Sequence, residues 1–158
     1  MSTEQFNQEI VIVAAKRTPM GGFQGSLSGV TSPSLAATAI KALLADTQVA
    51  PDKVDEVLMG CVLPAGLGQA PARQATLGAG LPLSVGATTV NKVCGSGMKT
   101  VMLAHDLLKA GSAKLVVAGG MESMSQAPYL LDKARSGMRM GHGKVLDHMF
   151  LDGLEDAY

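Results

Sequence analysis

Apolar residues follow two alternating patterns along most of the chain. Short runs rich in β-branched residues alternate with longer segments in which apolar residues recur at every third or fourth position. The short runs predict strands at 9–15, 54–62, 85–92 and 114–119. The longer segments predict helices at 32–47, 70–80 and 94–110. This alternation of strands and helices indicates an α/β fold, in which helices cover a mainly parallel or mixed sheet.

Details of the pattern add three expectations. Ser32 is a suitable N-cap for the first helix, with Pro33 at the first helical position. The helix at 94–110 is apolar on most of its sides, so we expect it to be buried between the layers of an αβα arrangement. After Gly120 the periodicity stops, and scattered Gly, Pro and Met residues indicate a loop-rich region. The chain is thus predicted to divide into an α/β domain at 1–119 and the beginning of a loop domain at 120–158.

Composition and charge argue against several classes of function. The 158 residues are 47% hydrophobic and 16% charged, which is typical of a packed globular protein. Thirteen Lys and Arg residues balance 13 Asp and Glu residues, without the basic face expected of a nucleic-acid partner. No stretch approaches the roughly 18 apolar residues of a membrane span, so no membrane partner is expected. Two cysteines are too few for a disulfide framework, which favours a cytoplasmic location with both thiols reduced.

The sequence context of Cys61 and of the three histidines indicates structural roles. Cys61 lies inside an apolar run and is predicted to be a core residue of a strand. His105, beside Asp106 on the polar side of its helix, is expected to be solvated. His142 and His148 are six residues apart, which is the wrong separation for a helical pair of metal ligands, so no metal site is predicted.

Cys94 is different, because it stands where the strand at 85–92 leads into the helix at 94–110. The unpaired amides of a helix's first turn, together with the helix dipole, stabilise a thiolate at this position. Gly95 and Gly97 leave room for an acyl group and let backbone N–H groups approach an oxyanion. A lone cysteine is nevertheless more often a small, inert core residue. On the residues alone, the nucleophile and the core interpretation stand about equal.

Three segments resemble hallmarks of the thiolase family, in the family's order and at its spacing. The segment NKVCGSGMK resembles the active-site signature of that family, AGGMESMS resembles a second hallmark after the next strand, and VLPAGLGQAPARQA resembles the dimer-interface segment. The opening AAKRTPMGGFQGSL also fits the family, so the similarity covers essentially the whole chain. The forms of the motifs are most similar to those of short-chain acetyl-CoA acetyltransferases.

The resemblance implies a transferase that acts on thioesters. Cys94 would accept the acetyl group of one acetyl-CoA, with its own backbone N–H as an oxyanion donor, and a second acetyl-CoA would attack the acetyl-cysteine to give acetoacetyl-CoA. Thiolytic cleavage is the reverse reaction. No cofactor is implied, because the coenzyme A thioesters are substrates.

The resemblance also implies partners and binding residues. Leu154 matches a residue that lines the pantetheine channel, and Met140 is expected near it. Arg73 falls in the interface segment and is interpreted as an interface or supporting residue. A homotetramer built as a dimer of dimers is expected, with the second contact formed by the region after Gly120.

The sequence also departs from the family pattern. The family's two bases, a His and a second Cys, belong to a C-terminal half that this sequence does not contain. Neither Cys61 nor any of the three histidines matches those bases. We favour a truncated, processed or partial thiolase over a half-enzyme that needs its C-terminal half from a separate chain. Two further alternatives are a condensing enzyme of the ketoacyl-synthase kind, which shares this fold and a cysteine at a helix end, and an inactive half that serves assembly.

Overall fold

The computed structural model describes residues 9–158, so residues 1–8 of the first predicted domain lie outside it. Its principal elements, in chain order, are α1 (Ser32–Thr47), β1 (Glu56–Gly60), α2 (Pro71–Gly78), β2 (Gly86–Val90), α3 (Ser96–Lys109) and β3 (Val116–Gly120). A short 3₁₀ turn, η2 (Pro51–Lys53), links α1 to β1. The predicted strands at 54–62, 85–92 and 114–119 and all three predicted helices are therefore confirmed, with most bounds differing by a few residues.

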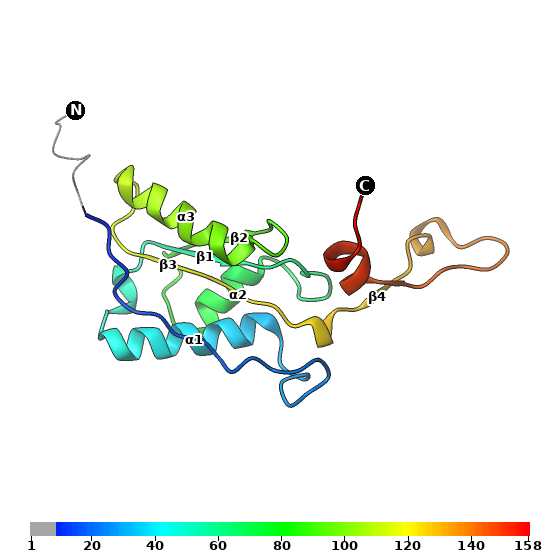
Figure 1. Cartoon of the computed structure of the whole chain (residues 1–158), viewed down its shortest axis with the longest axis horizontal. Helices are drawn as coiled ribbons and strands as arrows, with labels where there is room; N and C mark the ends of the chain where they lie inside the picture. Colours follow the sequence, from blue (N-terminus) through cyan, green and yellow to red (C-terminus); the bar gives the residue numbers. More distant parts are fainter. Residues whose placement is uncertain (1–8) are drawn as a thin grey trace.

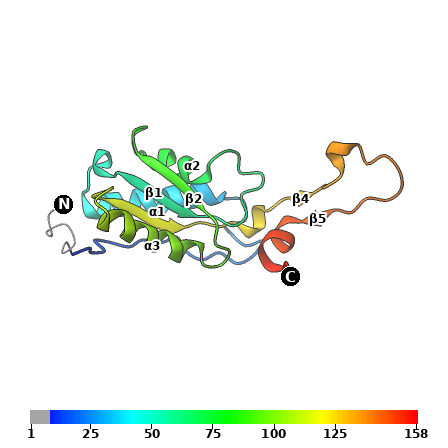
Figure 2. The same cartoon turned by 90° about the horizontal axis from the view of Figure 1, so that it is seen from above.

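The strands form a parallel sheet in the order β2-β1-β3. Helix α3 covers one face of this sheet, while α2 and α1 lie on the other, which gives three layers (Figures 1 and 2). In the register of the sheet, Gly60 lies opposite Val90 of β2 and Gly120 of β3. All three carboxyl ends therefore meet at one edge, the place where ligands of parallel α/β folds bind.

Alternation along β1 sorts its side chains between the two helical layers. Val57, Met59 and Cys61 belong to the main core, together with buried residues of α1 and α2. Leu58 and Gly60 point the other way, toward α3, because successive strand residues face opposite sides of a sheet. The α3 face of β1 thus ends in a residue without a side chain.

The predicted strand at 9–15 is wrong. The structure assigns no strand to these residues, and Val11, Ile12 and Val13 are exposed. A strand requires a neighbour that completes its hydrogen bonds, and no described residue supplies one here. The segment instead runs past α1 (Figure 1). Lys16 in this segment forms an ion pair with Asp46 of α1.

The start of α1 also differs in detail from the prediction. Its N-cap is Thr31, so the helix begins at Ser32, one position earlier than expected, and Pro33 is its second residue. The side chain of Ser32 is completely buried. The proline still lies in the first turn, where its missing N–H costs nothing.

The prediction that α3 is buried on all sides is wrong for this chain. Only the side of α3 that faces the sheet is buried. The buried residues on that side are Ser96, Thr100 and Ala104. Met98 and Met102 are 75% and 53% exposed. Within residues 9–158, the apolar side chains of Met98 and Met102 thus lie on a face of α3 that nothing covers.

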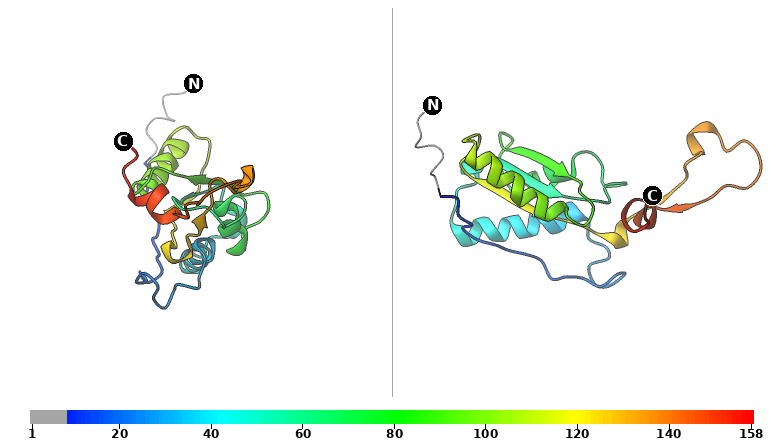
Figure 3. Two further views of the ribbon diagram at one scale, coloured as in Figure 1. Left: turned by 90° about the vertical axis from the view of Figure 1, so that its right-hand side faces the viewer. Right: turned by 45° about the horizontal axis from the view of Figure 1, so that its top comes forward.

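The segment after β3 contains only short elements. These are η3 (Met124–Gln126), β4 (Tyr129–Leu130), η4 (Ala134–Ser136), β5 (Leu146–Asp147) and the π-helical turn η5 (Phe150–Leu154). Strands β4 and β5 pair antiparallel, and the chain between them projects away from the α/β layers (Figure 3). Of the helices in residues 9–158, none has the length and apolar character needed to cross a bilayer.

Candidate active site

Cys94 lies at the carboxyl edge of the sheet, in the short connection between β2 and α3, and its side chain is exposed. It lines an open pocket of about 330 Å³. The pocket is formed by Gly60, Val62, Val93, Cys94, Ser96, Gly97, Gly120, Met121 and Glu122, which come from the ends of β1 and β3 and the start of α3. The core interpretation of Cys94 is thereby excluded in this structure, because its thiol borders solvent.

The connection that carries Cys94 is held in a strained conformation. Val93 has a φ of 47°, which is unfavourable for a β-branched residue and costs about 1–3 kcal/mol. Its N–H donates to Asn91 Oδ1 at 2.9 Å, and its carbonyl accepts from the Ser96 hydroxyl at 2.6 Å. The Ser96 hydroxyl also accepts the Lys92 N–H at 2.8 Å. These side-chain bonds maintain the turn that presents the thiol at the first turn of α3.

Glycines let the start of α3 approach the sheet closely. A Cβ on Gly60 would lie 2.7 Å from Gly97 N and from both Ser96 C and Ser96 Cβ, so only glycine fits there. A Cβ on Gly120 would lie 3.3 Å from the Gly97 Cα. One turn later, the hydroxyl of Thr100 lies 2.9 Å from the Gly119 carbonyl, to which it can donate. The position of Cys94 relative to the edge of the sheet therefore depends on Gly60, Gly97 and Gly120.

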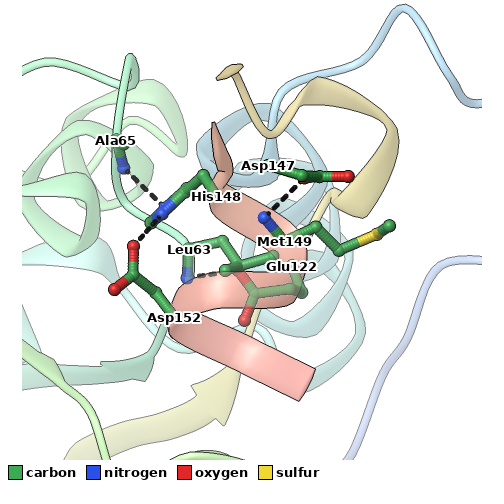
Figure 4. Close-up of polar contacts among 7 residues, drawn as sticks. All are labelled: Leu63, Ala65, Glu122, Asp147, His148, Met149 and Asp152. Atoms are coloured by element: carbon green, nitrogen blue, oxygen red, sulfur yellow. Dashed lines mark hydrogen bonds and ion pairs between the residues drawn. The ribbon is translucent and has the colours of Figure 1, made fainter. Parts of the chain in front are cut away.

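Glu122 is a residue of the pocket that the sequence analysis did not single out. Its carboxylate accepts the backbone N–H of Val62 at 2.8 Å and that of Leu63 at 3.0 Å (Figure 4 shows the second bond). It thus ties the loop after β1 to the end of β3. Its position two residues after the Gly119-Gly120 pair that ends a strand was the available signal, since polar residues at strand ends build sites in parallel sheets.

Cys61 is confirmed as a core residue, with 1% of its surface exposed. Its thiol donates to Glu122 Oε1 at 3.6 Å. Burial, followed by the nearby charge of Glu122 and the hydrogen bond to it, raises the pKa of the Cys61 thiol to about 11. Cys61 therefore remains a thiol at neutral pH, and only Cys94 is accessible for covalent chemistry.

The histidines lie where expected, with one exception. His105 is exposed beside Asp106, as predicted. His148, expected in a loop, is instead 4% exposed and lies between Asp152 and the Ala65 amide (Figure 4). The signal for this pair was the spacing of four residues, which brings two side chains together on one helical turn.

The remaining predicted site residues lie outside the Cys94 pocket. Leu154 is 55% exposed at the end of η5, and Met140 is 97% exposed in the projecting link between β4 and β5. Arg73 donates from its guanidinium to the carbonyls of Leu83 and Val85, and so holds the turn that leads into β2. The structure thus gives Arg73 a supporting role within the chain.

Other parts of the described chain offer no competing site. Within residues 9–158, no group of three or more His, Cys, Asp and Glu residues is arranged to hold a metal ion. A larger surface depression, of about 650 Å³, is lined by Arg17, Thr18, Pro19 and Met20. Its lining residues include no thiol, carboxylate or imidazole.

Comparisons with known proteins found one matching family model and several relatives. Residues 10–158 match the family model described as "Thiolase, N-terminal domain". A Pseudomonas aeruginosa protein named acetyl-CoA acetyltransferase is 54% identical over 151 residues, which are 96% of this chain and 38% of that protein. Its counterpart in Cupriavidus necator is 55% identical over 150 residues, 95% of this chain and 38% of that protein.

A plant relative gives the same result. Acetyl-CoA acetyltransferase 1 of Arabidopsis thaliana is 54% identical over 151 residues, which are 96% of this chain and 36% of that protein. The chain thus spans less than two fifths of the length of the curated relatives it matches.

Proposed function

Because this chain belongs to the thiolase family, we propose that it carries the nucleophile of an acetyl-CoA C-acetyltransferase, with Cys94 as the residue that becomes acetylated. The observation that carries the proposal is the exposed thiol of Cys94 at the carboxyl edge of a parallel sheet, two residues before α3 begins. The names of the relatives support acetyl-CoA as the substrate.

The proposed reaction has two steps at the same sulfur. In the first, the Cys94 thiolate attacks the thioester carbonyl of acetyl-CoA, the bond from the carbonyl carbon to the CoA sulfur breaks, and CoA leaves with a proton. In the second, a second acetyl-CoA loses a proton from its methyl group, and the resulting carbanion attacks the acetyl-cysteine. Acetoacetyl-CoA forms and the Cys94 thiolate is released.

This chain contributes the nucleophile and its surroundings to that reaction. The backbone N–H of Cys94, just before α3, is the proposed donor to the oxyanion of each tetrahedral intermediate. The bases that remove and return protons are proposed to come from the C-terminal half of the thiolase fold. Loss of a positioned base typically costs about 10² to 10⁴ in rate, so condensation depends on that half.

Binding and assembly follow the same proposal. We place Leu154, and less directly Met140, along the path of the pantetheine arm, since both are exposed apolar side chains in the segment after β3. The segment 62–75 is the proposed contact between two copies, and the region after Gly120 is the proposed contact between two such dimers. The cytoplasm is the proposed compartment, because two free thiols require reducing conditions.

One experiment tests the central step. The chain is incubated with acetyl-CoA, digested and analysed by mass spectrometry, with Cys94→Ala and Cys61→Ala variants in parallel. We expect one acetyl group on Cys94, retained in the Cys61→Ala variant and lost in the Cys94→Ala variant. In the complete enzyme, condensation of the acetyl-cysteine with a malonyl thioester in preference to a second acetyl-CoA would favour the ketoacyl-synthase alternative, and acetylation elsewhere would refute Cys94 as the nucleophile.

A further inference from the structure

His148 joins three segments that are far apart in the sequence. Its Nδ1 lies 2.5 Å from Asp152 Oδ2 in η5, and its Nε2 accepts the backbone N–H of Ala65, in the loop after β1, at 3.4 Å. Its own backbone N–H donates to the carbonyl of Pro128, just before β4. The ring is almost completely buried at this junction (Figure 4).

The hydrogen bonds select one tautomer of the neutral ring. An amide N–H can only donate, so Nε2 must be the acceptor and cannot carry a proton. The proton of the neutral imidazole therefore resides on Nδ1 and points to the Asp152 carboxylate. Both nitrogens are occupied, so His148 has no free site with which to act as a base or to bind a metal.

The loop after β1 is therefore anchored at two points. Glu122 holds its first residues, Val62 and Leu63, and His148 holds Ala65. Val62 and Glu122 both line the pocket of Cys94. The position of this loop, which borders the Cys94 pocket at Val62, thus depends on Glu122, a residue of the pocket, and on His148, which lies outside the pocket.

Contacts of η5 connect the second anchor to the proposed binding path. A Cβ built on Gly153 would lie 3.3 Å from Leu63 Cδ2, so η5 packs directly on the anchored loop. Leu154 follows in the same turn. Movement of His148 would therefore shift η5, which carries Leu154 of the proposed binding path, relative to the loop.

We propose that His148 is a positioning residue for thioester binding, which holds Ala65 and thereby fixes the loop that borders the Cys94 pocket. This inference rests on the proposed function for its substrate. It predicts an effect on KM rather than on the intrinsic reactivity of Cys94, because the start of α3 is held separately, by the Gly60 contacts and by Thr100.

Two substitutions distinguish the role of the Nδ1 contact from that of the Nε2 contact. In His148→Asn, the side-chain amide can replace Nδ1 toward Asp152 but leaves nothing to accept the Ala65 N–H. In His148→Gln, the longer side chain places an amide oxygen at the position of Nε2, where it can accept that N–H. Asp152→Ala is a milder variant for the case in which His148→Asn does not fold, and His105→Asn is the control at an exposed histidine beside an aspartate.

The complete enzyme is assayed for KM and kcat with acetyl-CoA, for alkylation of Cys94 by iodoacetamide, and for hydrogen exchange of the Ala65 amide. We expect His148→Asn to raise KM roughly five- to tenfold, the cost of one buried hydrogen bond, and to accelerate Ala65 exchange by a similar factor. Alkylation of Cys94 should change by less than about twofold. His148→Gln should restore KM and exchange, Asp152→Ala should raise both weakly, and His105→Asn should change neither.

Equal effects of His148→Asn and His148→Gln would overturn the proposal, as would unaltered Ala65 exchange in His148→Asn. Failure of the proposed function would be recognised differently, as an unaltered protein that does not acetylate Cys94. In that case the exchange measurement still decides whether His148 anchors the loop.

Discussion

Substitution of Gly60 by alanine should dislodge the start of α3 and with it Cys94. The added Cβ would lie 2.7 Å from three atoms of Ser96 and Gly97, whereas ordinary van der Waals contact begins at 3.4 Å. These atoms would have to retreat by about 0.7 Å, and two of them belong to the helix backbone, so no side-chain rotation relieves the clash.

The magnitude follows from the cost of overpacking. Inserting a methyl group into a close contact of this kind costs about 1–3 kcal/mol, while the gain from restricting the unfolded chain offsets only about 0.4–1 kcal/mol. A net loss of roughly 1–2 kcal/mol is therefore expected for Gly60→Ala. A displacement approaching 1 Å at the nucleophile is also of the size that reduces catalysis by about 10²-fold in positioned active sites.

Two other glycines provide a graded series. Gly120→Ala places its Cβ 3.3 Å from the Gly97 Cα and should have a smaller effect in the same direction. Gly22→Ala has nothing within 4 Å of its Cβ and serves as the control. Urea denaturation gives the loss of stability, and the rate of Cys94 alkylation by iodoacetamide reports its geometry. A Gly60→Ala protein that matches Gly22→Ala in both measurements would refute the argument that glycine contacts position Cys94.

Three further predictions concern titratable groups of the same region and of the sheet. Iodoacetamide at pH 8 should modify Cys94 and leave Cys61 unmodified in the folded chain, because Cys61 is buried and its pKa is raised to about 11; mass mapping that finds Cys61 modified first would contradict this. Glu122→Gln should lower the free energy of unfolding by about 1–3 kcal/mol, measured in urea. The N–H groups of Val62 and Leu63 each donate to a different carboxylate oxygen of Glu122, whereas a glutamine amide has only one oxygen that can accept them. Asp55 accepts two backbone N–H groups at the start of β3, which lower the pKa of its carboxyl. Its contribution is therefore present above the ordinary carboxyl pKa and is lost as the pH falls through the lowered one, so Asp55→Asn should be destabilising at pH 7 and progressively less so in acid denaturation.

The sequence by itself determined the local elements of this protein and singled out Cys94 as a candidate nucleophile. The strands around Val57, Thr88 and Val117 and the three helices follow from period-two and helical patterns, bounded by Pro33, Pro71 and glycines. These signals are local, because each depends on residues within one or two turns of the chain. The motif around Cys94 could be recognised from the sequence for the same reason, since Gly95 and Gly97 lie close to Cys94 in the chain.

Only the tertiary structure decided which apolar surfaces are covered and which polar groups meet. The pattern at 9–15 has the composition of a strand, but a strand exists only where another backbone completes its hydrogen bonds. The outer face of α3 has the composition of a buried surface, but periodicity reports that a face is apolar and not what lies against it. Glu122 and His148 were not recognised as anchors, because their partners in the loop after β1 are about 60 and 83 residues away in the chain. Contacts over such separations are set by the packing of layers, and no local pattern encodes them.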